Sequence, residues 1–393
     1  MIAPSLETAL KSFPADELGS ITAIRRDLHR HPELAFAETR TAGVIARELR
    51  SFGLSPRESV GKTGLLCDFG RSDPPRLMIR ADMDGLPLNE ESAVPYASEE
   101  AGRMHACGHD GHVAIGLAVA RRLVGSPAGT GIRSLFQPAE EQGGGAHAMV
   151  GDGALEGVGA AIGIHLWNQL PVGKIGLVAG PQMAAVDEFE IVLSGPGGHG
   201  ASPHETVDPI VGAARVVEGL QSVVAREVSP FDPAVVTVGS IHGGSAFNII
   251  PREVRLLGTA RSFSEEAFRS IPEKISRLAE GIAAAHGLSC RLEYRRINRA
   301  TVNDRKTTAI VVEAVESVLG AGSIAEARTM GGEDMSVYLD RVPGCFFFVG
   351  SAPEGPHRAH HSPVFDFDER ALAVGTLVLE AAARAVAQRL TGA

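Results

Sequence analysis

Four short apolar runs recur along this chain, with segments of helical periodicity between them. They are Leu77–Ile79, Ile132–Phe136, Ala160–Ile164 and Cys345–Val349. Buried strands that alternate with helices are typical of a largely parallel, doubly wound α/β sheet. In such a sheet, ligands bind beyond the carboxyl ends of the strands. The pattern therefore predicts the fold class and the edge of the sheet where a site would lie.

A change of composition near Gly180-Pro181 marks the start of a second domain. From Asp187 onward, the sequence predicts about four strands and two helices, which form an α/β sandwich. We expect this sandwich to occupy residues 183–296 and to interrupt a first domain made of residues 1–182 and 297–393. A chain of 393 residues commonly holds about two domains.

Charge and targeting signals exclude several classes of partner. The formal net charge of −10 argues against nucleic acid or an anionic membrane as the main partner. The amino terminus lacks the basic start and apolar run of a signal peptide, and we expect no stretch that approaches the ~20 apolar residues of a membrane span. The four widely spaced cysteines do not resemble a disulfide framework. These features predict a reduced, cytoplasmic protein.

The stretch Met104–His112 concentrates groups that bind transition metals. It places three histidines, one cysteine and one aspartate within nine residues, spaced by small alanine and glycine. Thiolate, imidazole and carboxylate are the usual ligands of such metals. An isolated Cys107-x-His109 pair would indicate no more than a buried cysteine beside a polar loop, but hydrophobic burial does not explain the neighbouring His105, Asp110 and His112.

Further candidate ligands follow the predicted strands. Glu140 and Glu141 come after the second run, where one carboxylate can bind metal while the other transfers a proton. His165 ends the third run. Near the carboxyl terminus, His360 and His361 precede Ser362-Pro363. Each of these groups has a simpler interpretation, as solvated acids, a core histidine or a polar loop. Together they favour a metal site.

Other polar residues fit supporting roles. Asp82 and Asp84 can cap the chain or orient a ligand imidazole. In the inserted domain, His199 lies in a glycine-rich turn that could be a plain hairpin or could supply an oxyanion donor. Asn248 has a similar pair of interpretations, and Arg261 is either a surface charge or a fork for a substrate carboxylate. The chain has neither a Gly-x-Ser-x-Gly elbow nor a phosphate-binding Gly-x-x-x-x-Gly-Lys loop, which weakens serine-hydrolase and nucleotide-binding hypotheses.

Eight motifs, in order and across nearly the whole chain, resemble those of one family. They are Asp27–Leu34, Asp82–Pro87, His105–Asp110, Phe136–Glu141, Gly198–His204, Asn248–Pro251, Gly331–Asp334 and His361–Pro363. The set is similar to the amidohydrolase branch of the zinc aminoacylase/carboxypeptidase metallopeptidases, which includes hippurate hydrolases, N-acyl-amino-acid amidohydrolases and auxin-conjugate hydrolases. The run Gln142–Gly145 after the acids departs from the family pattern, and we expect it to affect loop shape more than substrate contacts.

The resemblance implies a binuclear site and a role for each candidate. The implied ligands of two divalent metals (Zn, Mn, Co or Ni) are Cys107, His109, Glu141, His165 and His361. Cys107 would be shared between the metals, and Glu140 would be the general base. Asp84 would orient the ligands, and His199 would stabilise the oxyanion, in many relatives from a partner subunit. Asn248 and Arg261 would hold the substrate.

The expected reaction is hydrolysis of the amide bond of an N-acyl amino acid. Two cations would activate a water molecule and polarise the scissile carbonyl, and Glu140 would carry the proton from that water to the leaving nitrogen. The resemblance further implies a lid or dimerisation role for the inserted domain and a homodimer formed through it. Alternatives are a dipeptidase, a deaminase-like or other metal-dependent C–N hydrolase, or a metal-binding protein without activity. The retained Glu140 argues against the last of these.

Overall fold

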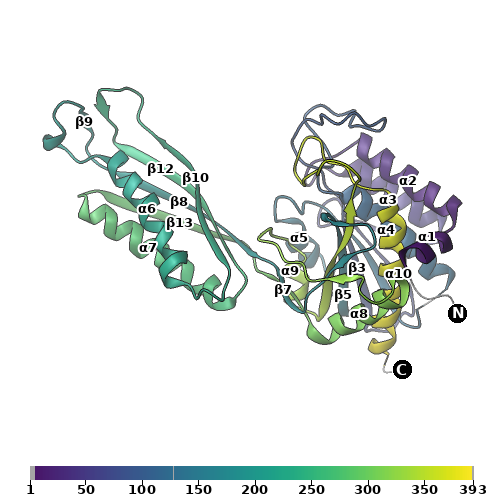
Figure 1. Ribbon diagram of the computed structural model, residues 1–393. Helices are drawn as coiled ribbons and strands as arrows, with labels where there is room; N and C mark the ends of the chain where they lie inside the picture. Colours follow the sequence, from purple (N-terminus) through teal and green to yellow (C-terminus); the bar gives the residue numbers. More distant parts are fainter. Residues whose placement is uncertain (1–4, 127, 392–393) are drawn as a thin grey trace. The chain divides into compact units, whose positions relative to one another are not determined.

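The computed structural model describes residues 5–126 and 128–391, and the chain divides into two compact units. The first unit holds residues 1–182, 302–328 and 334–393, and the second holds residues 183–301 and 329–333 (Figure 1). The insertion predicted over residues 183–296 stays a prediction, and the second compact unit extends beyond it to Thr301 and includes residues 329–333. Its last strand, β13 (Ser289–Asn298), stays paired with β8 (Ala185–Ser194) to the end, and Thr329 and Gly331 accept hydrogen bonds from Ala184.

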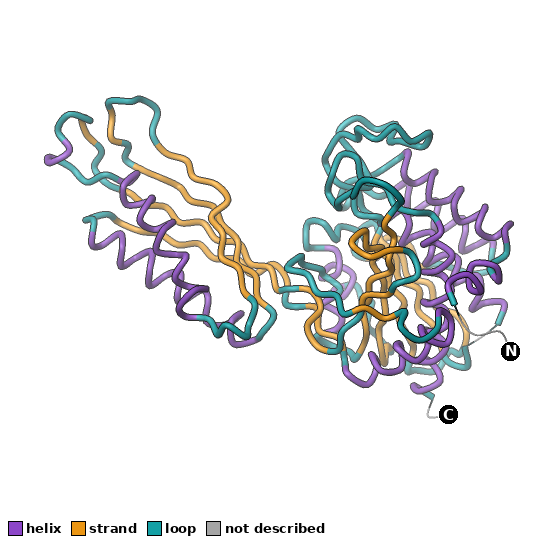
Figure 2. Tube along the Cα trace, in the orientation of Figure 1, coloured by secondary structure: helices purple, strands orange, loops and turns teal. Residues whose placement is uncertain are grey.

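An eight-stranded sheet forms the centre of the first unit, with the order β1-β2-β4-β3-β5-β16-β6-β15. Figure 2 draws the strands in orange. The strands of this sheet are β1 (Arg57–Val60), β2 (Gly64–Gly70), β3 (Arg76–Asp82), β4 (Gly131–Gln137), β5 (Val158–Pro171), β6 (Ile175–Gly176), β15 (Ile324–Ala325) and β16 (Gly344–Ala352). The four central strands run parallel, and β1, β2 and β6 add antiparallel pairs. The predicted α/β class and the four predicted strands are confirmed.

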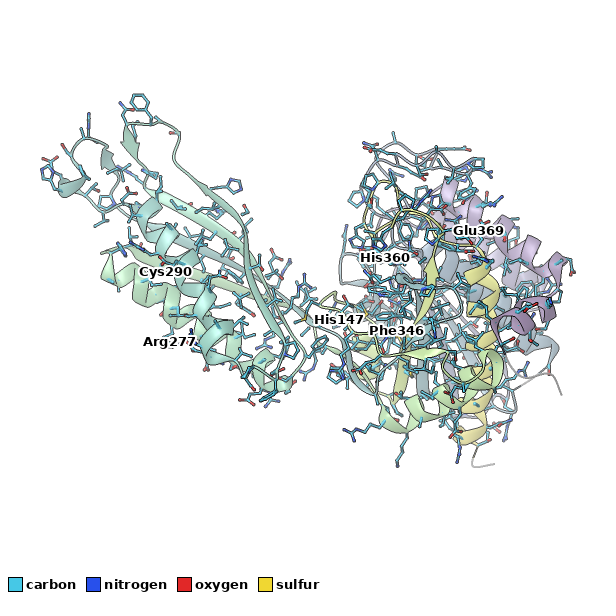
Figure 3. All side chains as sticks on the ribbon, viewed as in Figure 1. His147, Arg277, Cys290, Phe346, His360 and Glu369 are labelled. Carbon is cyan, nitrogen blue, oxygen red and sulfur yellow. The ribbon has the colours of Figure 1, made fainter. Side chains whose placement is uncertain are left out.

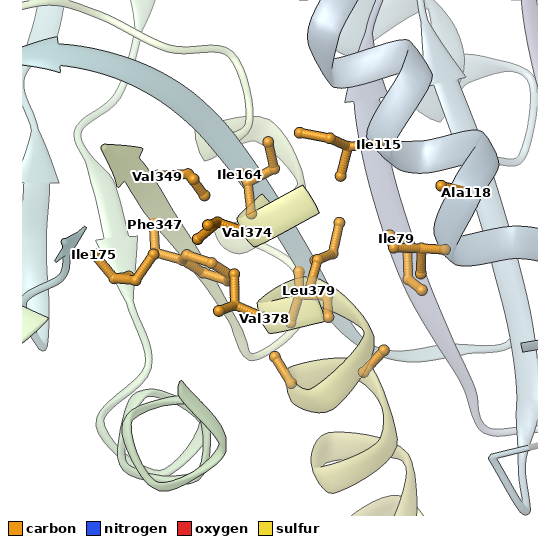
Figure 4. Packing of buried hydrophobic residues seen from close by; sticks show 14 of the residues in the cluster. Ile79, Ile115, Ala118, Ile164, Ile175, Phe347, Val349, Val374, Val378 and Leu379 are labelled. Carbon is orange, nitrogen blue, oxygen red and sulfur yellow. The ribbon is translucent and has the colours of Figure 1, made fainter. Parts of the chain in front are cut away.

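Eight helices are assigned to the first unit within its described residues. They are α1 (Leu6–Ser12), α2 (Ala15–Arg30), α3 (Thr39–Ser51), α4 (His109–Gly125), α5 (Gly145–Gly151), α8 (Arg305–Leu319), α9 (Ser336–Leu339) and α10 (Arg370–Leu390). The apolar faces of α4 and α10 pack on β3 and β5. In Figure 4, Val374, Val378 and Leu379 of α10 lie in the same core as Ile164 of β5 and Phe347 of β16.

Helix α10 corrects one expectation. It is 21 residues long and contains an 18-residue window with a mean hydropathy of 1.3, so by length and composition it could cross a membrane. The sequence prediction that no stretch approaches that length is wrong at this helix. However, 67% of its most apolar window is buried inside the protein, against α4, α8 and the sheet. Its hydropathy is that of a helix covered by protein on most sides.

The second unit is a four-stranded antiparallel sheet, in the order β10-β12-β8-β13, packed against two helices. Its remaining elements are α6 (Pro209–Glu227), β10 (Ala234–Gly243), β12 (Glu253–Ser262), α7 (Glu265–Ala285) and a short ladder of β9 (Gly198–His199) with β11 (Ile249–Ile250). Alternating buried residues of β8 and β12 meet the apolar faces of α6 and α7. Two more short strands, β7 (Gly180–Met183) and β14 (Thr301–Asn303), pair where the chain passes between the units.

Candidate metal centre

The loop before α4 brings the first three candidate ligands together. Gly108 adopts a left-handed conformation with φ of 92°, which turns the chain between Cys107 and the first residue of the helix, His109. The helix therefore starts directly after this turn, at His109. Cys107 Sγ lies 3.4 Å from His165 Nε2, and ligand atoms of Cys107, His109 and His165 lie within 4.8 Å of one another.

His165 reaches this cluster from within a strand, not from beyond its end as predicted. Strand β5 continues to Pro171 because it stays paired with β16, with His165 opposite Phe348. The His165 Nδ1 atom lies 2.7 Å from the carbonyl oxygen of Leu166. With Nδ1 as the donor in that hydrogen bond, Nε2 is the nitrogen left for a metal.

A second group of three ligand atoms combines Cys107 with Glu141 and His361, again within 4.8 Å of one another. Glu141 Oε1 lies 3.4 Å from His361 Nε2. His361 has a φ of 61°, and its backbone N–H donates to the carbonyl of Ala106, so its loop is tied directly to the loop that carries Cys107. Cys107 belongs to both groups, and its role as a ligand shared between two metals stays a prediction.

The geometry of the donors fits a metal. The Nε2 atom of His109 and the Oε1 atom of Glu141 are buried, have no hydrogen-bond partner among the described residues, and lie 3.9 Å apart. Unpaired buried polar atoms are costly in a folded protein. Two ligands of one ion with bonds of about 2.0–2.3 Å lie roughly 3–4 Å apart. A cation between these atoms would remove the cost.

The neighbouring histidines have other partners. His112 Nδ1 lies 2.5 Å from Asp82 Oδ1, and its Nε2 accepts the N–H of Leu166, so both ring nitrogens are used. His360, labelled in Figure 3, lies with Nε2 3.0 Å from the carbonyl of Leu166 and stacks on Trp167. His105 is fully buried and is outside both groups. Of the adjacent histidines, His361 is the one beside Glu141.

Asp84 lies at the centre of the cluster but does more than orient a histidine. Its backbone carbonyl lies 3.0 Å from His109 Nδ1. Its two carboxylate oxygens accept the backbone N–H groups of Glu140 and Glu141, each at 3.1 Å. Side-chain oxygens of Glu140 and Glu141 and a ring nitrogen of His109 lie within 4.8 Å of one another. One aspartate thus fixes the backbone of both glutamates against the first histidine.

The pKa directions follow from burial and nearby charge. Burial opposes protonation of His109, yet the charge of Asp82 and the hydrogen bond to Asp84 hold its pKa well above the usual value. Burial disfavours ionised Glu141, but His361 and His109 hold its pKa below the usual value. Burial, reinforced by Glu141, raises the pKa of the Cys107 thiol well above its usual value. A cation would therefore displace the thiol proton.

A buried group behind the cluster was missed in the sequence. The Arg80 guanidinium contacts Asp82 Oδ2 at 2.5 Å, Asp334 Oδ1 at 2.9 Å and Gln137 Oε1 at 3.0 Å. Arg80 directly follows the apolar run Leu77–Ile79, and a charge at this buried position was the available signal. Asp334 belongs to a motif used for the family resemblance, but its partner could not be read from it.

The three remaining candidates lie in the second unit and do not form one group. His199 and Asn248 are exposed neighbours across the β9–β11 ladder, where Gly200 N–H donates to the Asn248 carbonyl at 2.8 Å. Arg261 is half-buried near the other end of β8, opposite Val186. The ten residues of β8 span roughly 30 Å. Arg261 and His199 of one chain are therefore too far apart to touch the same small substrate.

Comparisons with known proteins match this chain to one peptidase family. Residues 78–385 match the model of peptidase family M20/M25/M40. The chain belongs to this family. Among its relatives, the N-acetyl-L-cysteine deacetylase of Bacillus subtilis is 40% identical over 355 residues, which cover 90% of this chain and 84% of that protein. The IAA-amino acid hydrolase ILR1-like 2 of Arabidopsis thaliana is 37% identical over 90% of this chain and 82% of the relative.

A solved M20 structure extends the comparison to the metals. The YXEP protein of Bacillus subtilis, described as a dinuclear metal binding peptidase, superposes with a TM-score of 0.84 at 35% identity, over 95% of this chain and 99% of that chain. This M20 chain is thus a metal-dependent amidohydrolase that uses two divalent metal ions. The family resemblance, the α/β fold and the enzyme class predicted from the sequence are confirmed.

Proposed function

We propose that this enzyme hydrolyses the amide bond of N-acyl L-amino acids and releases a carboxylic acid and a free amino acid. The observation that carries the proposal is the pair of ligand groups that share Cys107, with Glu140 beside His109 and Glu141. In this proposal, Cys107, His109 and His165 bind one metal, and Cys107, Glu141 and His361 bind the other. The mixed ligands suit Zn, Mn, Co or Ni.

Each residue of the site then has a task. When bound, the two ions polarise the scissile carbonyl and lower the pKa of the attacking water. Glu140 accepts the proton of that water and returns it to the leaving nitrogen. Asp84 keeps Glu140 and Glu141 in register through their backbone N–H groups. Because Glu140 is the residue proposed to carry this proton, its removal should abolish proton transfer.

His199 and Arg261 are the proposed substrate contacts of the second unit, together with Asn248. The N–H of Ala201 donates to His199 Nδ1 at 3.0 Å, which leaves Nε2 to carry the hydrogen and to donate to an oxyanion. The Arg261 guanidinium makes no hydrogen bond or ion pair with another described residue. A half-buried guanidinium with free donors suits the carboxylate of an amino acid. The names of the deacetylase and the amino acid hydrolase support the same substrate class.

The decisive experiment measures amino acid release from N-acetyl, N-benzoyl, longer N-acyl and indoleacetyl amino acids, with dipeptides alongside. The wild-type enzyme should cleave at least one acyl class, and Glu140→Gln, loaded with the same metals, should lose about 10²–10⁴-fold in kcat. Cys107→Ala should lose metal as well as activity, which separates binding from catalysis. Near-normal turnover by metal-loaded Glu140→Gln would refute the mechanism, and cleavage of dipeptides alone would make the enzyme a dipeptidase.

We further propose a cytoplasmic homodimer that completes each site across subunits. All four cysteines are free, which supports a reducing compartment. Because His199 and Arg261 of one chain cannot reach the same substrate, one of them must act on a substrate held by a second copy. The second unit also exposes apolar side chains around the β9–β11 ladder and the start of α6, namely Ile210, Val211, Ile241, Phe247 and Ile249. Exposed apolar side chains gathered in this way favour subunit contact.

Complementation between two inactive variants tests the dimer. Glu140→Gln and His199→Ala should each be inactive alone. After subunit exchange, half of the dimers are mixed, and each contains one site with both residues, so the mixture should recover about a quarter of wild-type activity. Sedimentation analysis of Phe247→Asp should show a shift to monomer. Absence of recovery in a mixture that is shown to exchange subunits would rule out shared sites.

A further inference from the structure

Glu38 is a fully buried acid that the proposed mechanism does not use. It occupies the position before the first residue of α3, yet its side chain does not cap that helix. The carboxylate of Glu33 does so instead, because it accepts the N–H groups of Arg40 at 3.0 Å and Thr41 at 2.8 Å. Glu38 is therefore free to point inward. Burying a carboxylate costs free energy unless its oxygens accept hydrogen bonds. The hydrogen-bond partners of Glu38 therefore show which part of the structure it holds in place.

One partner of Glu38 lies in the loop that carries the proposed base, and the other lies between β1 and β2. The Oε1 atom of Glu38 accepts the backbone N–H of Ala139 at 2.8 Å, and its Oε2 atom accepts the hydroxyl of Thr63 at 2.5 Å. Ala139 immediately precedes Glu140. It has a φ of 52°, a left-handed conformation that is unfavourable for a residue with a Cβ atom.

Three consecutive N–H groups in this loop thus end on buried carboxylates. Ala139 donates to Glu38, while Glu140 and Glu141 donate to the two oxygens of Asp84. The carbonyl of Ala139 is also engaged, because Gly145 N–H donates to it at 3.1 Å. A side chain at Gly145 would come within 1.6 Å of the Pro138 carbonyl oxygen. The segment after Glu141, which leads to Gly145, is therefore packed as closely as the segment before Glu140.

We propose that Glu38 is a positioning residue that holds Ala139 in its left-handed conformation and thereby aims Glu140 at the substrate. Thr63 keeps the Glu38 carboxylate in place from the other side. Without Glu38, the Ala139 N–H would be buried without a partner and the residue would relax toward negative φ. That rotation would turn the following peptide and displace the Glu140 side chain. The inference rests on the proposed role of Glu140 as general base.

Rescue by glycine tests the inference. Glu38→Ala should lower kcat about 30–100-fold with little change in KM, because a misplaced base weakens the chemical step more than binding. Adding Ala139→Gly should recover at least about tenfold, since glycine adopts positive φ without a partner. Glu38→Gln keeps an acceptor for Ala139 and a donor for Thr63, so it should stay within about threefold of wild type. Ala139→Gly alone is the matched control.

A purely structural role for Glu38 predicts a different result. With a purely structural role, Ala139→Gly would recover part of the melting temperature, because glycine relieves the left-handed strain at φ 52°, but it would not recover the kcat of the folded, metal-loaded enzyme. If the kcat of the double variant is equal to or below that of Glu38→Ala, the inference is wrong. It is equally wrong if Glu38→Ala leaves kcat unchanged. If Glu38→Ala does not fold, a kcat of Glu38→Gln reduced as far as that of Glu140→Gln would overturn the inference, and a near-normal value would support it.

Cobalt binding supplies a readout that does not depend on catalysis. The absorbance of Co²⁺ bound by the Cys107 thiolate can be titrated with the metal alone in each variant. Since Glu141 also follows Ala139, Glu38→Ala should weaken Co²⁺ binding about tenfold, and the glycine should restore it. If Glu140→Gln retains turnover, the proposed function fails, yet this titration still decides whether Glu38 sets the loop. Unchanged Co²⁺ affinity in Glu38→Ala would count against the inference.

Discussion

Two buried arginines of the first unit, Arg25 and Arg80, differ from Arg261 of the second unit in how their hydrogen-bond donors are used. In the first unit, the fully buried Arg25 contacts the carboxylates of Asp110 at 2.9 Å and Asp366 at 2.7 Å. Arg80 is similarly enclosed behind the metal ligands. In the second unit, Arg261 is half-buried and makes no hydrogen bond or ion pair with the rest of the described chain. Saturated guanidiniums fix a structure, whereas one with free donors is prepared for a ligand.

The pKa values of these arginines express the same contrast. Burial works against charged Arg25, but Asp110 and Asp366 outweigh it, so its pKa is raised. For Arg261, burial prevails over the weaker opposing effect of Asp187, so its pKa is lowered. A guanidinium remains charged in either case. What differs is how much of the positive charge is compensated by nearby carboxylates. A substrate carboxylate would compensate the charge of Arg261.

Breaking the Arg25 cluster should give the largest effect on stability. Arg25→Met leaves Asp110 and Asp366 as buried charges without their cation, which should lower the free energy of unfolding by about 3–5 kcal/mol. Chemical denaturation followed by circular dichroism reports both units, and the fluorescence of Trp167, the single tryptophan, reports the first unit. Arg295→Ala is the matched control in the second unit. Its pair with Glu188 is exposed, at 72% and 51%, and should contribute less than about 1 kcal/mol. Equal losses in the two variants would remove the contrast.

Much of the framework of the site was predictable because it depends on local pattern. Asp82, Glu140 and Glu141 follow strands whose apolar runs are visible in the sequence, and the parallel sheet brings strand ends to one edge. The start of α4 at His109 could not be predicted from the pattern, because it depends on the left-handed conformation of Gly108. His165 was placed beyond its strand because the length of β5 is set by pairing with β16, about 180 residues later.

The supporting hydrogen bonds could not be predicted in the same way. Arg25 and Asp366 are 341 residues apart, and Glu38 and Ala139 are 101 residues apart. No periodicity in the sequence connects such pairs. Charged residues are usually solvent-exposed, so their type alone does not predict that they are buried. The distance between Arg261 and His199 likewise became clear only from the register of β8 with β12. The sequence therefore indicated which residues could take part in binding or catalysis. It did not indicate which residues are fixed by hydrogen bonds or which partners fix them.

A buried neutral histidine beside Asp110 should make the stability of the first unit depend on pH. Burial lowers the pKa of His105 to about 4, although the charge of Asp110 opposes this. The unfolded chain takes up this proton below about pH 6.5, whereas the native protein does so only near pH 4. Stability is therefore lost as the pH falls between these values, by about 2–3 kcal/mol.

The variant His105→Gln isolates this contribution. Its free energy of unfolding, measured without metal, should depend less on pH than that of the wild type between pH 7 and pH 4.5, by about 2 kcal/mol. Other acids contribute equally to both proteins and cancel in the difference. Parallel pH dependences of the two proteins would show that His105 is protonated in the native state, and the Arg25 cluster would then hold one more charge than its geometry implies.

Arg261 should give the smallest change in free energy, and it acts on substrate rather than on stability. Lysine keeps the positive charge but lacks the paired N–H donors with which a guanidinium binds a carboxylate. Arg261→Lys should therefore lower kcat/KM for N-acyl amino acids about tenfold to fiftyfold, mainly through a higher KM. The matched control is Arg255→Lys on the same strand, where Arg255 lies 3.6 Å from Glu190 and is exposed. A substrate whose carboxylate is replaced by an amide should be cleaved poorly by the wild type and no worse by Arg261→Lys. If the variant instead loses the same factor on both substrates, Arg261 serves the fold, and the contrast between the two units disappears.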